Sequence, residues 1–151
     1  MTHSFAVLVF SLSVLSTSAF AADDFEQRKI TGKDSVLVAK AMKNAGAAIV
    51  PFAPDTSSDH PVVEGMSERV YRMESVVCRE KNCEGFKSTA AELKKLDQIF
   101  RKLGVKETRP PAAPKGKSGK PYIFIQELLC AVEKDLTTPT TCFVSAHFKS
   151  P

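Results

Sequence analysis

The sequence predicts an α+β fold, stapled by disulfides, in which two amphipathic helices pack on an antiparallel sheet of about four to five strands. Three observations predict this class. Two segments carry apolar residues at the three- and four-residue spacing of a helix, and three later segments are rich in β-branched and aromatic residues. All four cysteines fall within or next to the strand-like segments.

The first helix is expected from about Lys33 to Ala45. Its apolar residues recur on one face, and Gly46 is a natural stop because glycine tolerates the left-handed conformation that ends many helices. Before it, Thr31 and Asp34 stand three residues apart and resemble a capping box. The spacing therefore predicts both ends of this helix.

The second helix has the clearest pattern in the chain. Thr89 and Glu92 form a capping box at its start, and Gly104 closes it. The apolar face consists of Leu93, Leu96, Ile99, Phe100 and Leu103. The residues assigned to the polar face are Lys94, Lys95, Asp97, Arg101 and Lys102.

The strands are expected at Arg69–Arg79, from Tyr122 to about Lys134, and at Cys142–Phe148. In the second strand, one face is assigned to Tyr122, Phe124, Leu128, Cys130 and Val132. Gln126 interrupts that face. After the leader the chain has a polar start, Asp23–Lys29. The proline-rich stretch Glu107–Pro121 is read as a surface loop or linker.

An apolar leader, Phe5–Leu15, followed by Ala19-Phe20-Ala21 predicts a signal peptide over residues 1–21. Residues 22–151 are then expected to form a single small domain in the periplasm or outside the cell. No later apolar stretch approaches the ~18 residues of a membrane span, so no stable membrane insertion is expected after cleavage. Helix, strand and cysteine recur in the same order, which suggests two related sub-units, 30–86 and 88–148.

The cysteines are interpreted as structural. Local pairing, Cys78 with Cys83 and Cys130 with Cys142, is favoured because each pair flanks a turn of hairpin length. Crossed pairing between the two sub-units stays open. A zinc site fits the spacing poorly, a thiol activated by His147 would need Cys142 unpaired, and the chain has no C-x-x-C for redox exchange.

Composition sets broad limits on partners. The chain is 43% hydrophobic and 25% charged, with a formal net charge of +4, which is ordinary for a globular protein. The mild positive charge favours solubility over a nucleic-acid partner. Neither a cofactor nor a metal is predicted.

Two polar segments are candidate contact sites. Asp55, Asp59 and His60 could move a proton or bind a metal, but also suit a solvated loop. The basic segment holding Lys115, Lys117 and Lys120 contains Gly-Lys-Ser. It lacks the first glycine of a phosphate-binding loop, and a strand is expected where that loop needs a helix.

The sequence favours a non-enzymatic binding protein over an enzyme. It has no catalytic motif, and its proline-bounded segments are expected to present contact surfaces on a stapled frame. An inhibitor or immunity-type protein for an envelope enzyme fits this reading. The alternatives are an envelope hydrolase using Asp55, Asp59 and His60, and a structural, polymer-binding protein using the Lys115–Lys120 segment.

Overall fold

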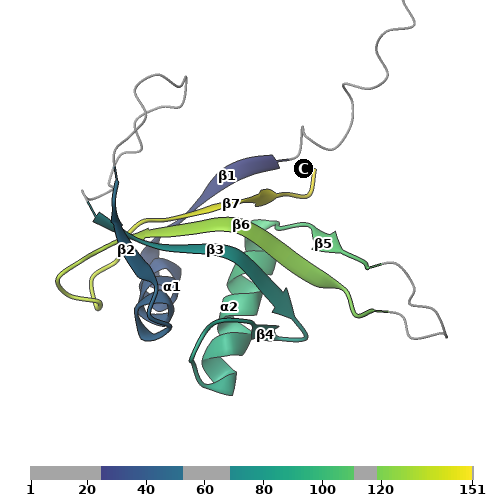
Figure 1. Cartoon of the computed structure of the whole chain (residues 1–151), viewed down its shortest axis with the longest axis horizontal. Coiled ribbons are helices and arrows are strands. Elements are labelled where there is room, and N and C mark those ends of the chain that lie inside the picture. Colours follow the sequence, from purple (N-terminus) through teal and green to yellow (C-terminus); the bar gives the residue numbers. More distant parts are fainter. Residues whose placement is uncertain (1–24, 53–68, 111–118, 151) are drawn as a thin grey trace, which may run out of the picture.

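The computed structural model describes residues 25–52, 69–110 and 119–150, and it has two helices on one face of an antiparallel sheet (Figure 1). The elements are β1 (Phe25–Ile30), α1 (Gly32–Asn44), β2 (Ala48–Pro51), β3 (Arg69–Arg79), β4 (Asn82–Cys83), α2 (Ala90–Leu103), β5 (Glu107–Thr108), β6 (Tyr122–Ala131) and β7 (Cys142–His147). The α+β class is confirmed. None of the described helices is long and apolar enough to cross a bilayer.

The sheet has seven strands rather than the four to five expected. Its main path is β1-β7-β6-β3-β2, while β4 pairs with β3 and β5 pairs with β6. The strands expected by residue range correspond to β3, β6 and β7. Among the additional strands, β1 and β5 lie in segments that the sequence marks only as a polar start and as a loop. Both are short or polar segments whose strand conformation comes from pairing with a neighbour, β7 for β1 and β6 for β5.

Strand β1 is held at the sheet edge by an arginine. Arg28 donates from Nη1 to the Leu103 carbonyl at 2.9 Å, and its guanidinium carbon lies 4.3 Å from the centre of the Phe148 ring. A Cβ at Gly104 would lie 2.7 Å from the same nitrogen, and Gly104 has φ of 103°. Glycine is therefore favoured at this helix end by conformation, and a larger residue would also displace the Arg28 guanidinium.

The helices begin as their sequences suggest, with one difference. Thr89 accepts a hydrogen bond from the Glu92 amide, and the Glu92 carboxylate accepts one from the Thr89 amide, which confirms the capping box of α2. Thr31 is the N-cap of α1 but makes no side-chain capping bond, so the predicted box is wrong there. Instead Ser35, fully buried, donates to the Gly32 carbonyl at 2.7 Å.

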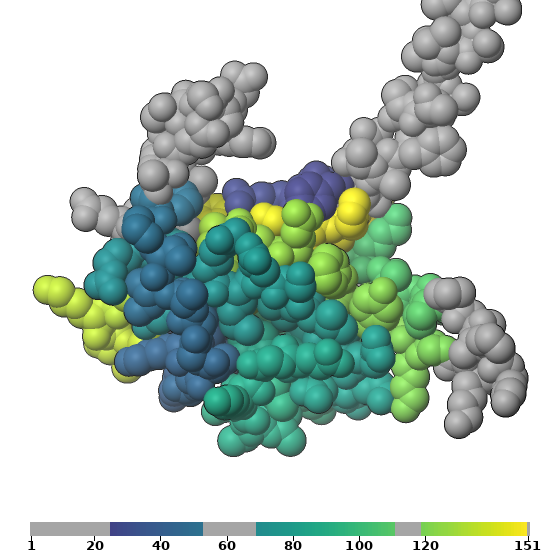
Figure 2. All heavy atoms as spheres, viewed as in Figure 1, coloured from purple at the N-terminus to yellow at the C-terminus, as the bar shows by residue number. Residues whose placement is uncertain are grey.

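The core lies between the helices and the centre of the sheet. Figure 1 shows both helices on the same side of the sheet, and in the same view Figure 2 shows the atoms of β1 (purple) and β7 (yellow) along the opposite, upper side. The largest fully buried side chains there include Phe100, Phe148, Met42, Leu96, Ile125 and Leu128. Burial of these apolar groups is the main favourable contribution to folding.

The register between strands β3 and β6 is the same along their whole length, but the pairing is interrupted once. At that point one residue of each strand is unpaired, and the two unpaired residues lie opposite each other. Glu74 pairs with Glu127 and Val76 with Ile125, which leaves Ser75 and Gln126 between the pairs. Ser75 has φ of 54°, and Gln126 is also the point where the β6–β7 register shifts. We call this feature the double bulge.

Side chains along a strand normally point to alternate faces of the sheet. The double bulge interrupts this alternation, so in both strands the residues that face the helices change from one parity to the other after it. In β6 the helix-facing residues are Ile123, Ile125, Leu128 and Cys130. Tyr122 and Phe124, assigned above to the same face as Leu128, lie on the other side and are partly or largely exposed. That assignment was wrong because a two-residue period was carried through Gln126.

The two disulfides join Cys78 to Cys83 and Cys130 to Cys142, the local pairing that the spacing favours. Each joins two residues that face one another in an antiparallel pair. The first fixes the short strand β4 to β3, and the second fixes β7 to β6. All four cysteines are buried, and no described cysteine is free.

We predict that loss of the Cys130–Cys142 bond destabilises the protein more than loss of the Cys78–Cys83 bond. The sequence separations are 12 and 5 residues, and chain entropy gives about 3 and about 2 kcal/mol for such loops. The measurement is equilibrium urea unfolding of Cys130→Ala/Cys142→Ala and Cys78→Ala/Cys83→Ala. All four cysteines are almost fully buried, so the difference in stability should come from the loop lengths. Equal or reversed losses would contradict the prediction.

Candidate binding surfaces

The residues predicted as contact sites belong to segments that start from opposite ends of the sheet. Asp55, Asp59, His60, Lys115 and Lys117 lie outside the described residues. The segment 53–68 connects β2 to β3 at the Arg69 end of β3, and 111–118 connects β5 to β6 near the Cys78 end. Because β3 and β6 have about ten residues each, these ends lie about 30 Å apart.

Lys120 is the one predicted contact residue that the structure describes. Its Nζ lies 2.7 Å from a carboxylate oxygen of Glu80, in the turn after β3, and both side chains are well exposed. The pair brings the start of β6 next to the β3–β4 hairpin. The positive charge of Lys120 is therefore compensated by the neighbouring Glu80.

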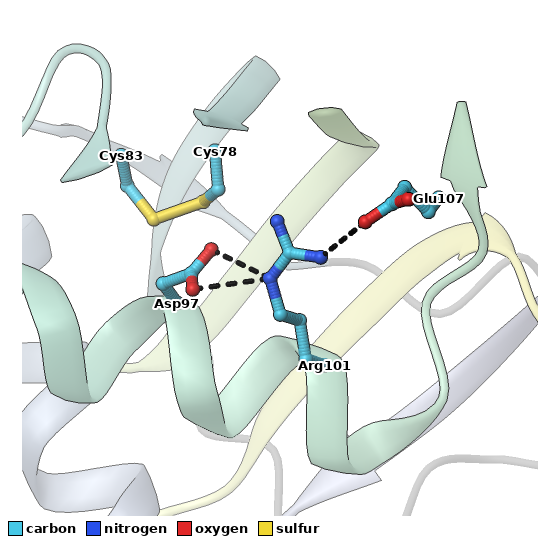
Figure 3. A network of polar contacts seen from close by, with 5 residues as sticks. All are labelled: Cys78, Cys83, Asp97, Arg101 and Glu107. Carbon is cyan, nitrogen blue, oxygen red and sulfur yellow. Dashed lines mark hydrogen bonds and ion pairs between the residues drawn. A yellow bond between two sulfur atoms is a disulfide. The ribbon is translucent and has the colours of Figure 1, made fainter. Parts of the chain in front are cut away.

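The buried acidic residue on α2, Asp97, makes structural contacts. The Asp97 side chain is only 5% exposed, and both its carboxylate oxygens accept from Nε of Arg101 at 3.0 Å. Arg101 Nη1 in turn donates to Glu107 of β5 at 2.9 Å. Figure 3 shows this chain of contacts beside the Cys78–Cys83 disulfide.

The electrostatics of this network favour the charged form of Arg101. Burial acts to lower the pKa of Arg101, but hydrogen bonds and attraction from Asp97 and Glu107 outweigh it, so the pKa is raised. The network thus ties α2 to β5 by charge-assisted hydrogen bonds. The sequence placed Asp97 on the solvated face of α2, and that was wrong because Arg101, one turn later, lets the carboxylate be buried.

One candidate binding surface is a groove between the two helices. Two hollows of about 210 and 250 Å³ share Leu37 of α1 and Lys95 of α2. Their apolar floor is formed by Val36, Leu37, Ala41 and Ile99. The lysines at its sides are Lys33, Lys40, Lys95 and Lys102. We call this surface the helix groove.

The charges of the helix groove are not neutralised from within the described chain. All four lysines are exposed, and none forms an ion pair with another described residue. Asp34 and Glu92 also line the groove, so four positive charges face two negative ones. Glu92 is engaged in the capping box. The groove therefore combines apolar surface with a net positive charge.

No described group of three or more His, Cys, Asp or Glu side chains is arranged to hold a metal ion.

Comparison with known proteins does not assign a function to these surfaces. No family model matches the chain, and no curated protein or solved structure matches it either.

We predict that Asp97→Ala lowers the free energy of unfolding by about 2 kcal/mol. Breaking a buried ion pair costs about 3 to 5 kcal/mol, and partial exposure of Arg101 reduces that figure. Urea unfolding at neutral pH measures the loss. Lys94→Ala, at an exposed position on the same helix, should stay within about 0.5 kcal/mol of the natural protein. A loss no larger for Asp97→Ala than for Lys94→Ala would show that the network does not stabilise the fold.

Proposed function

We propose that the protein is an exported, non-enzymatic binding protein that holds an acidic protein partner in the helix groove. An inhibitor or immunity-type role toward an envelope enzyme is the form of this function that we favour. Two disulfides suggest an oxidising compartment, the periplasm or the extracellular space, and the apolar leader supports export.

The observation that carries the proposal is the helix groove itself. Leu37 and Ile99 are only partly buried in its floor, so apolar surface stays available between two rows of charge. Unpaired lysines around an apolar centre match the arrangement of a protein interface, with an apolar core and a polar rim. Their positive sign selects a partner segment that presents carboxylates beside apolar side chains, and it speeds encounter with such a segment.

The rigid frame adds to the proposal. Both helices pack on a sheet in which disulfides join β3 to β4 and β6 to β7. The two sides of the groove are therefore held in place before a partner binds. A preformed surface loses less conformational entropy on binding than a mobile one. The groove can therefore support tight binding without a large area.

The test is charge reversal on the two sides of the groove. A partner captured from envelope extract and identified by mass spectrometry is purified, and its Kd is measured for the natural protein and for Lys40→Glu/Lys95→Glu. We expect the Kd to rise at least about tenfold, which corresponds to about 1.4 kcal/mol, and binding to weaken as salt is added.

The matched control is Lys29→Glu/Lys134→Glu, which makes the same charge change at exposed positions outside the groove. If both double variants weaken binding equally, net charge and not the groove governs the interaction. If the purified partner binds Lys40→Glu/Lys95→Glu with unchanged Kd, the proposed surface is wrong.

A further inference from the structure

The face of the sheet opposite the helices has a hollow of its own, of about 470 Å³, at the double bulge. Its lining includes Phe25 of β1, Arg72 and Ser75 of β3, Gln126 and Glu127 of β6, and Ser145 of β7. The volume is within the range of about 300 to 1,000 Å³ that is common for small-molecule sites. Four strands therefore contribute to one concave surface, which we call the sheet hollow.

The double bulge accounts for this concavity. Bulges bend and twist strands locally, and here the strands β3 and β6 are bulged at the same level. Ser75 and Gln126 are exposed, and their side chains form no hydrogen bond with another described residue. Their hydroxyl and amide groups are therefore available to a ligand as donors and acceptors.

The charges in the sheet hollow argue against an anionic ligand. Arg72 Nε donates to Glu127 at 2.9 Å, and the same guanidinium forms an ion pair with Glu74, which also lines the hollow. One cation against two carboxylates leaves one negative charge. A phosphate or carboxylate ligand would be repelled, and a cationic ligand would have to compete with Arg72 for the same two carboxylates.

The polar groups that remain suit a ligand with many hydroxyls. The carboxylates of Glu74 and Glu127 keep free lone pairs, and the guanidinium of Arg72 has five N–H donors, not all used. Ser145 Oγ accepts from Nε2 of Gln27 at 3.4 Å, which leaves its own proton free to donate. Closely spaced donors and acceptors of this kind can hydrogen-bond to neighbouring hydroxyls, each of which both donates and accepts.

An aromatic ring completes the surface. Phe25 is 39% exposed, and its ring stands edge-on to His147 with centres 5.3 Å apart. The contact orients the ring, which leaves a flat apolar surface beside the polar groups. A pyranose presents C–H groups on one face and hydroxyls around its rim, so it can cover such a ring while its hydroxyls reach the polar groups.

We propose that the sheet hollow binds a neutral saccharide, with Phe25 as the stacking platform and Gln126, Ser75 and the Arg72–Glu127 pair as hydrogen-bonding groups. The hollow is open at the surface, so a chain of several sugar units can pass across it. This site lies on the opposite face from the helix groove and does not depend on it.

Saturation-transfer NMR on the disulfide-bonded mature protein tests the proposal, with cellohexaose, maltohexaose and chitohexaose as probes and tetragalacturonate as the anionic comparison. We expect at least one neutral hexasaccharide to bind with an affinity that falls about tenfold or more in Phe25→Ala and in Gln126→Ala. Tetragalacturonate should bind more weakly than that neutral probe. Lys40→Glu/Lys95→Glu should bind the saccharide as the natural protein does, which separates this proposal from the helix groove.

Phe124→Ala is the matched control, because Phe124 is 38% exposed and lies on the same face but does not line the hollow. It should leave binding unchanged, and thermal unfolding of each variant checks that the fold is kept. The proposal fails if none of the three neutral probes binds, if tetragalacturonate binds as well as the best of them, or if Phe124→Ala weakens binding as much as Phe25→Ala.

Discussion

The pairing of β3 with β6 is the constraint on which the rest of the structure depends. These two long strands lie at the centre of the sheet, and every other strand except β1 pairs with one of them. Each strand also carries one half of a disulfide: Cys78 of β3 is bonded to β4, and Cys130 of β6 is bonded to β7. Because the helices pack on the face that this pair presents, a change in its register would move all core residues at once.

The double bulge in that pair gives the two faces of the sheet different properties. It lets Ile125 and Leu128, three residues apart, both enter the core, and it turns Phe124 and Glu127 to the other side. The helix-facing side is continuous and apolar. The opposite side has a buried apolar cluster near the Arg69 end, formed by Val70, Leu129 and Phe143, and it is mostly polar and concave at the bulge.

The helix groove and the sheet hollow differ in whether their charged side chains form ion pairs within the described chain. In the helix groove, lysines such as Lys40 and Lys95 have no described acidic partner, so their field is available to another molecule. In the sheet hollow, Arg72 is paired by two carboxylates of the chain, so specificity there has to come from hydrogen bonds and shape. Long-range attraction suits a charged protein partner, while short-range directional contacts suit a neutral ligand.

The sequence by itself determined the features whose signals are local. The α+β class, the capping box at Thr89 and the strand Arg69–Arg79 follow from spacing and composition over a few residues. Spacing also favoured the local cysteine pairing, but it left crossed pairing open until the strands were placed. Turn length and helix capping act between near neighbours, so no tertiary information is needed to read them.

Tertiary structure decided what depends on partners distant in the chain. Strand β1 has a polar sequence and exists because it pairs with β7, more than one hundred residues later. The face of Phe124 depended on a bulge shared with Ser75, and the burial of Asp97 depended on the packing of α2 beside the Cys78–Cys83 hairpin. The helix groove and the sheet hollow each combine side chains from elements far apart in sequence, so their geometry arises only when those elements pack.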